Sequence, residues 1–345
     1  MKYKHKYLSI TALLYSASSL CFSANSFADS TSTDIGLGYS LSNMSNPVST
    51  DFDDIDLSTQ GHSLQLSYNM EDWLFGASYS VANNSVTNNG DSASENNSQI
   101  TASFDQIGYE FYSSYFVDNW TLSIAIGNNE LDYETNITRA FPNPQNPVLN
   151  EVHLTSQNYT NQFLDVSVGY WLDLSKLTDD LSLSVDIGVT QYESEIYQSN
   201  AVIINQLRDS SILDDFLNDR GVDIGTQEET EITTTPSESI ITISASLDHI
   251  FLVSDKAVFS SVWVSQEWSD EESSVINFSR SQDGRINNQT FDGDNVFESS
   301  DATVTYLSFG VNSELLLTDN FSVSAGYSKT QDYDGQWQLG MFYQF

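Results

Sequence analysis

The last nine residues of this 345-residue chain alternate between large apolar and mostly polar side chains, and this pattern constrains the fold more than any other. The apolar face carries Trp337, Leu339, Met341, Tyr343 and Phe345, where the chain stops, and Phe342 alone breaks the polar face. Alternation with a period of two predicts a β-strand. In a soluble sheet, that final strand would expose an apolar face and an unpaired edge. In a closed barrel in lipid, the apolar face contacts lipid and the edge pairs with the first strand.

Short segments rich in Asp and Asn separate further alternating runs along the chain. Five of them are predicted to be tight turns: Glu71-Asp72, Asp118-Asn119, Ser175 to Asp180, Ser254 to Lys256, and Asp319-Asn320. Asp and Asn are favoured in turns because they tolerate the required backbone angles. Six longer polar stretches are predicted to be loops: 43–59, 83–98, 134–155, 198–235, 270–299 and 331–335. Short turns that alternate with long loops predict twelve antiparallel strands, or ten or fourteen if a loop hides a hairpin.

The predicted strands follow from these boundaries. They cover residues 33–42, 60–70, 73–82, 100–117, 120–133, 157–174, 181–197, 238–253, 257–269, 301–318, 320–330 and 336–345. In the run 100–117, the apolar positions change parity between Phe104 and Ile107, which predicts a β-bulge near Asp105 and Gln106. Aromatic residues at strand ends are predicted to form interfacial girdles, namely Trp73, Trp120, Phe321 and Phe345.

The final strand also carries a motif with fixed spacing. A polar residue at Gln338 is followed by Gly340, and aromatic residues stand at Tyr343 and Phe345. This segment resembles the C-terminal β-signal of bacterial outer-membrane barrels. The resemblance implies an all-β, antiparallel transmembrane barrel of about twelve strands, with short periplasmic turns, long acidic extracellular loops and both termini in the periplasm. It further implies outer-membrane lipid, lipopolysaccharide, the barrel-assembly machinery and periplasmic chaperones as partners.

The N-terminus agrees with export to that compartment. Three lysines in the first six residues precede an apolar stretch from Ile10 to Phe22, and Ser26-Phe27-Ala28 supplies small residues for cleavage. This pattern predicts a signal peptide at residues 1–28 and a barrel at 29–345. The single cysteine, Cys21, lies within the predicted signal peptide, so the mature chain would have no disulfide and no thiolate metal site.

The charge of the chain is strongly acidic. It has 48 acidic and 11 basic residues, and three of the basic ones precede residue 29, which leaves 8 in the mature chain. Nucleic acid is excluded as a partner because phosphate binding needs clusters of Lys and Arg. The field of the protein disfavours an anion-selective pore and favours cations, including divalent ions that bridge lipopolysaccharide. The alternative is that acidic loops only keep the surface soluble.

Strand parity places a set of acidic side chains on the inner face of the barrel. The predicted lumen-lining residues are Asp165, Asp173, Asp186, Asp248 and Glu314. A twelve-strand barrel lined by small polar residues is wide enough for a water-filled path. The pattern predicts a narrow, porin-like passive channel that prefers cations and has no cofactor. A lumen that is blocked by a loop and conducts nothing is an equal alternative.

Two loop features are candidates for gating or ion binding. Apolar residues from Ile203 to Leu217 recur at near-helical spacing before Arg220 and Gly221, which predicts an amphipathic helix in loop 198–235. The helix would constrict the mouth or pack on the loop stalks. The acidic clusters 51–56 and 292–295 carry oxygen ligands suited to Ca²⁺, but neither completes an EF-hand loop, so no metal site is predicted.

Other classes of outer-membrane protein are weighed against the channel. His62, His153 and His249 are isolated, and they reproduce neither the His-Ser-Asn pattern of the phospholipases nor the Asp-x-His pair of the omptin proteases, so no catalytic residue is predicted. The chain also resembles the translocator domain of autotransporters in strand number and terminal aromatic residue. It departs from that family because it lacks a passenger and leaves no room for a plugging helix before the first strand. A structural or adhesive surface barrel is the remaining alternative.

Overall fold

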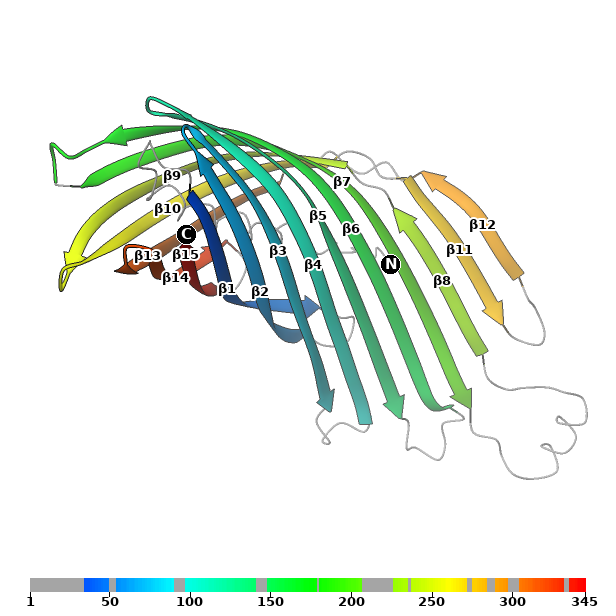
Figure 1. Ribbon diagram of the computed structural model, residues 1–345. Coiled ribbons are helices and arrows are strands. Elements are labelled where there is room, and N and C mark those ends of the chain that lie inside the picture. The colour runs from blue at the N-terminus through cyan, green and yellow to red at the C-terminus, as the bar shows by residue number, and fades with distance from the viewer. Residues whose placement is uncertain are drawn as a thin grey trace, which may run out of the picture.

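The computed structural model describes residues 34–49, 54–89, 97–140, 148–178, 180–206, 226–234, 237–271, 275–283, 289–296, 304–331 and 335–345 (Figure 1). All elements within these residues are β-strands of one sheet. The predicted signal peptide and the predicted helical segment beyond residue 206 lie outside the described residues. In the part of the chain that is described, no helix is long and apolar enough to cross a membrane.

Twelve of the strands form a closed antiparallel barrel, which confirms the predicted fold class. They are β1 (Asp34–Ser49), β2 (Asp54–Met70), β3 (Trp73–Asn89), β4 (Asn97–Val117), β5 (Trp120–Ala140), β6 (Val148–Asp173), β7 (Leu181–Gln206), β9 (Ser237–Val253), β10 (Lys256–Glu271), β13 (Val304–Thr318), β14 (Phe321–Thr330) and β15 (Gln336–Gln344). Each pairs with its sequence neighbour, and the pairing of β1 with β15 closes the barrel. Closure satisfies the backbone groups that would otherwise remain at a sheet edge.

Three further strands extend the wall beyond the barrel. The far half of β7 pairs with β8 (Thr226–Thr234), β8 pairs with β11 (Val275–Asp283), and β11 pairs with β12 (Gln289–Val296). Figure 1 shows this extension standing to one side of the barrel. The predicted loops 198–235 and 270–299 are therefore partly strand, and Ile203 belongs to β7 rather than to a helix. The hairpin of β11 and β12 does not change the number of barrel strands, because it pairs with β8 outside the closed barrel.

The five predicted tight turns are present and lie together at one end of the barrel, called the turn end below. Positive φ angles occur at Glu71, Asp118, Asp180, Ser254 and Asp255, all within these turns. The opposite end of the barrel is called the loop end below. Strands β4 to β7 extend furthest toward it and are 21 to 26 residues long. The barrel wall is therefore tallest on the side formed by these four strands.

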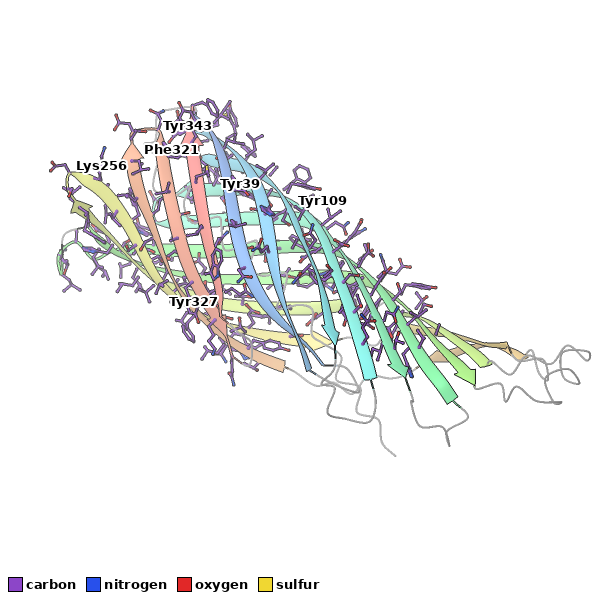
Figure 2. All side chains as sticks on the ribbon, turned by 90° about the horizontal axis from the view of Figure 1, so that it is seen from below. Tyr39, Tyr109, Lys256, Phe321, Tyr327 and Tyr343 are labelled. Carbon is purple, nitrogen blue, oxygen red and sulfur yellow. The ribbon has the colours of Figure 1, made fainter. Side chains whose placement is uncertain are left out.

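Large apolar side chains cover the outer surface of the barrel. Their exposed fractions include 52% for Leu66, 55% for Phe111, 52% for Ile126, 53% for Ile187 and 58% for Val262. Tyr39, Tyr109, Tyr327 and Tyr343 belong to the same surface (Figure 2). Water would penalise such a continuous apolar surface, so the surface requires a lipid environment or an apolar partner. Trp73 and Trp120 lie on it directly after their turns, as the girdle prediction requires.

The terminal strand β15 confirms the alternation from which the prediction began. Its odd-numbered residues from Trp337 to Phe345 are exposed, and its even-numbered residues face the interior. The exception, Phe342, is explained by β1: a Cβ atom at Gly36 would lie 2.0 Å from the Phe342 ring. The ring occupies the space above a glycine of the neighbouring strand, so an inward aromatic residue fits the closing seam.

The predicted bulge near Asp105 and Gln106 is wrong. The register of β4 with both β3 and β5 is continuous through these residues. Phe104 is buried on the inner face, whereas Ile107 is exposed on the outer face. The apolar positions of β4 change from even to odd because the apolar side chains move from the inner to the outer face of the sheet. The strand gains no residue. The register shifts that do occur lie between Val148 and Asn150 and between Leu316 and Thr318.

The tall wall is thus inverted relative to the barrel below it. Above the change, Phe104, Leu131 and Tyr159 form a buried inner cluster, while Asp105 and Glu130 are exposed on the outer face. The outer face thus turns from apolar to charged along β4 and β5. The inner cluster supplies this part of the wall with a hydrophobic core of its own.

Gly127 offers a test of packing on the inner wall. A Cβ atom there would lie 2.5 Å from the Phe163 ring and 2.5 Å from the Tyr109 carbonyl oxygen. Because the backbone oxygen cannot move aside, Gly127→Ala is expected to destabilise the barrel by about 1–3 kcal/mol. The control is Gly188→Ala, whose nearest neighbour, Ser167 Cβ, lies at 3.3 Å. The urea midpoints of unfolding of both variants are measured by heat-modifiable gel mobility. Equal stabilities of Gly127→Ala and Gly188→Ala would contradict the described packing at Gly127.

Candidate functional site

Five carboxylates lie on the inner wall at a similar height. Each is four to eight residues from the turn end of its strand, and the set is Glu110, Asp165, Asp186, Asp248 and Glu314. They come from β4, β6, β7, β9 and β13, so they are spread around the barrel rather than stacked on one strand. We call this set the carboxylate ring. The same levels of these strands carry the apolar outer surface, so the ring lies at the depth of that surface.

Glu110 and Asp165 form one part of the ring. Their charges interact, Glu110 is only 7% exposed, and a side-chain hydrogen bond links it to Ser78. Thr190 Oγ1 donates a hydrogen bond of 2.6 Å to Asp165 Oδ1. Two like charges held in such a sparsely hydrated place repel each other, so the pair gains from binding a proton or another cation.

Asp186 and Asp248 form a second part, on adjacent strands. Their charges interact. Ser246 Oγ donates a hydrogen bond of 2.9 Å to Asp248 Oδ2, and the hydroxyls of Ser184 and Ser246 are 2.7 Å apart. Asp186 extends over Gly169, where a Cβ atom would lie 2.1 Å from its Oδ1. The hydroxyls hold the carboxylates in place without neutralising them.

Glu314 completes the ring, whereas further acidic groups lie at other heights. Glu314 is buried and accepts a hydrogen bond from Ser322. Glu267, also buried, interacts with the charge of Glu238 nearer the loop end, and Glu238 accepts a hydrogen bond from Ser269. Asp173, predicted to line the lumen, instead ends β6 in an exposed position and accepts a hydrogen bond of 2.8 Å from the Ser175 backbone N–H. The structure therefore places Asp173 at the end of β6 beside a turn, outside the ring.

Basic side chains do not neutralise the ring within the described part of the chain. Lys176 and Lys256 lie in or beside turns, and Lys256 Nζ donates a hydrogen bond of 2.7 Å to the Leu317 carbonyl oxygen. Lys329 is exposed on the outward side of β14, in register with Phe309. Among the side chains that the structure describes, no Lys or Arg therefore faces the interior. The inner wall presents an uncompensated negative field.

Sequence reasoning missed Glu110 and the inward aromatic side chains. Glu110 lies between the outward residues Tyr109 and Phe111, and parity alone places it inside. The Tyr112 ring occupies the space above Gly76, and the Trp263 ring occupies the space above Gly310. A glycine on the neighbouring strand was the available signal, but it becomes readable only when the register is known.

The histidines lie apart from one another. Tyr39 Oη and His62 Nδ1 are 2.7 Å apart on the outer surface, and His249 stacks on Phe251 with ring centroids 5.6 Å apart. His153 lies near the loop end of β6, whereas His62 belongs to β2 and His249 lies near the turn end of β9. Within the described residues, no group of three His, Cys, Asp or Glu side chains could hold a metal ion.

The residues of the terminal motif lie at the closing seam. Gln338 Nε2 donates a hydrogen bond of 3.1 Å to Ser40 Oγ, and Gly340 is in register with Ser40 on β1. Tyr343 and Phe345 contact edge to face on the outer surface, with ring centroids 4.9 Å apart. The motif therefore combines seam hydrogen bonding on one face with an aromatic pair on the other.

Solved structures share this architecture. The translocator domain of the autotransporter NalP from Neisseria meningitidis aligns with a TM-score of 0.54 and 12% identity, over 97% of this chain and 97% of that one. The β-domain of the Bordetella autotransporter BrkA aligns with a TM-score of 0.50 and 10% identity, over 91% and 100% of the two chains. At these identities the likeness establishes the barrel fold alone. No protein-family model matches the chain, and no curated protein sequence matches it.

Single cysteines test which side chains face the lumen. Because the only native cysteine lies in the predicted signal peptide, Asp186→Cys and Ile187→Cys would each carry one thiol. In vesicles, we expect a water-soluble methanethiosulfonate to label Asp186→Cys much faster, since position 187 faces outward into lipid. The label is counted by mass spectrometry. Faster labelling at position 187 would contradict the assigned faces.

Proposed function

We propose that the chain is an outer-membrane β-barrel that acts as a porin-like passive channel with a preference for cations. The observation that carries this proposal is the carboxylate ring, which lies at the depth of the apolar outer surface and has no described basic partner. Every described element is a strand or a turn of the wall, so none of them crosses the lumen. Cations gain from the summed field of the ring, whereas anions are repelled.

The same features support an orientation in the membrane. The turn end would face the periplasm with both chain termini, and the tall wall would stand outside the cell, as expected for barrels with short turns on one side. The terminal motif at Gln338, Gly340, Tyr343 and Phe345 would engage the assembly machinery, with periplasmic chaperones as earlier partners. The apolar surface would contact outer-membrane lipid and lipopolysaccharide.

Ion selectivity tests the channel directly. In planar bilayers that separate unequal KCl concentrations, the wild type should give discrete conductance steps and a reversal potential of cation-preferring sign. Asp186→Asn combined with Asp248→Asn removes two ring charges, so the potassium-to-chloride permeability ratio should fall by about two- to tenfold. The matched control is Glu193→Gln with Glu195→Gln, which removes two exposed charges on the opposite face of β7. Silent bilayers with correctly folded protein would refute conduction.

A structural or adhesive surface barrel is the second candidate, and the extension built from β8, β11 and β12 favours it. These strands contribute nothing to barrel closure, yet they lengthen the wall at the loop end. Such an outlying sheet would offer a surface for attachment. The hydrolase alternative is weaker because His62, His153 and His249 lie apart from one another.

Removal of β11 and β12 separates the two candidates. Replacement of residues 275–296 by a short Gly-Ser linker leaves all twelve barrel strands intact. An adhesive barrel should lose binding of cells to an immobilised surface while conductance steps persist. A channel without adhesive function should show the same cell binding before and after the replacement.

A further inference from the structure

The outer face of β4 and β5 carries a patch of carboxylates where the tall wall leaves the apolar surface. Exposed carboxylates at Asp105, Glu130, Asp132 and Glu134 make up this patch, which we call the acidic belt. Asp105 lies two residues beyond the exposed apolar Ile107 on β4, and Glu130 lies four residues beyond Ile126 on β5. The belt therefore begins directly where the apolar surface ends.

The centre of the belt is a pair of directly opposed aspartates. Asp105 of β4 and Asp132 of β5 are register partners, and both are exposed. Directly opposite residues in an antiparallel pair hold their Cβ atoms about 4.5–5.5 Å apart, so like charges there destabilise the sheet. The described outer face of β3 to β7 carries no Lys or Arg that could offset this repulsion.

Oxygen-bearing side chains flank the aspartate pair in the same register row. Asn83 of β3 is the partner of Asp105, and Asn158 of β6 is the partner of Asp132. Asn158 Nδ2 donates a hydrogen bond of 2.5 Å to Asp132 Oδ1. Carboxylate and amide oxygens are the ligands preferred by Ca²⁺ and Mg²⁺.

An unpaired buried oxygen points to a ligand independently of the charges. Asn128 lies two residues below Glu130 on the same face and is only 7% exposed. Its Nδ2 donates a hydrogen bond of 3.2 Å to Glu130 Oε1, whereas its Oδ1 has no partner. A buried carbonyl oxygen without a donor costs free energy, and a cation held beside Glu130 would satisfy it.

We propose that the acidic belt binds divalent cations that bridge the protein to phosphate groups of the surrounding lipid. The proposal rests on the membrane placement given under Proposed function, but not on conduction. Mg²⁺ commonly takes one or two protein carboxylates and completes its shell with phosphate oxygens and water. A site of this kind needs no cluster of three protein ligands, which agrees with the described residues. The bridge also turns the repulsion between an acidic protein and an anionic lipid surface into attraction.

The test compares two kinds of vesicle. The mature protein is folded into phosphatidylcholine vesicles, whose headgroups carry no net charge, and into the same vesicles with added lipopolysaccharide. Each sample receives MgCl₂ or EDTA, and the midpoint of thermal unfolding is read from heat-modifiable gel mobility. We expect Mg²⁺ to raise the midpoint by roughly 2–4 °C only when lipopolysaccharide is present. An equal rise in both vesicles would mean that cations bind without lipid, and it would overturn the proposal.

Substitutions identify the belt as the cause. Asp105→Asn, Glu130→Gln and Asp132→Asn together should raise the midpoint in EDTA, because the repulsion is gone, and should abolish the response to Mg²⁺. Asp72→Asn, Asp118→Asn and Asp319→Asn together make the same charge change in exposed turns at the opposite end, and this control should keep the full response. A retained response in the belt variant would overturn the proposal.

A second measurement does not depend on unfolding. Lipopolysaccharide that stays bound to the purified, detergent-solubilised protein is quantified by phosphate analysis, with Mg²⁺ or EDTA present throughout. The wild type should retain lipopolysaccharide only with Mg²⁺, and the belt variant should retain little in either condition. Conductance of the same samples separates the two proposals: protein that conducts but lacks the Mg²⁺ response refutes the belt alone, and protein that never inserts into vesicles refutes both.

Discussion

Backbone hydrogen bonding in a medium without water is the constraint on which this structure depends. An N–H or C=O group exposed to hydrocarbon costs several kcal/mol, so a sheet in lipid must have no open edge. The seam between β1 and β15 meets this requirement. The packing of Phe342 over Gly36 follows from the same need, because the two strands must approach closely along the seam.

Once the sheet is closed, side-chain polarity decides what each height of the wall contacts. Where lipid surrounds the barrel, charges can lie only on the inner face, and there the carboxylate ring collects. Higher up on β4 and β5, charges such as Asp105 and Glu130 lie on the outer face, and the apolar groups Phe104 and Leu131 lie on the inner face. The ring and the acidic belt are therefore two outcomes of one rule, applied on opposite sides of a single boundary.

The fold was predictable because its signals are local. Turn residues such as Asp118-Asn119 and the period-two alternation of Trp337 to Phe345 need no knowledge of partners, and they located the barrel strands with their turn ends. The loop ends were harder, because polar strands that stand in water look like loops in sequence. Strands β8, β11 and β12 escaped prediction for this reason, and the inversion at Phe104 resembled a bulge because one strand alone does not show its surroundings.

The site residues were harder to predict, because their assignment requires the position of each residue along its strand as well as its parity. Parity placed Asp165, Asp186, Asp248 and Glu314 on the inner wall. It also selected Asp173, whose side chain instead accepts a hydrogen bond from the Ser175 N–H of the adjoining turn. The distance of a residue from the turn end of its strand separates the four ring residues from Asp173. That distance can be counted only when the ends of the strands are known. In the proposed channel, a cation would meet these carboxylates at the depth of the apolar surface, where the low-dielectric surroundings of the barrel weaken screening.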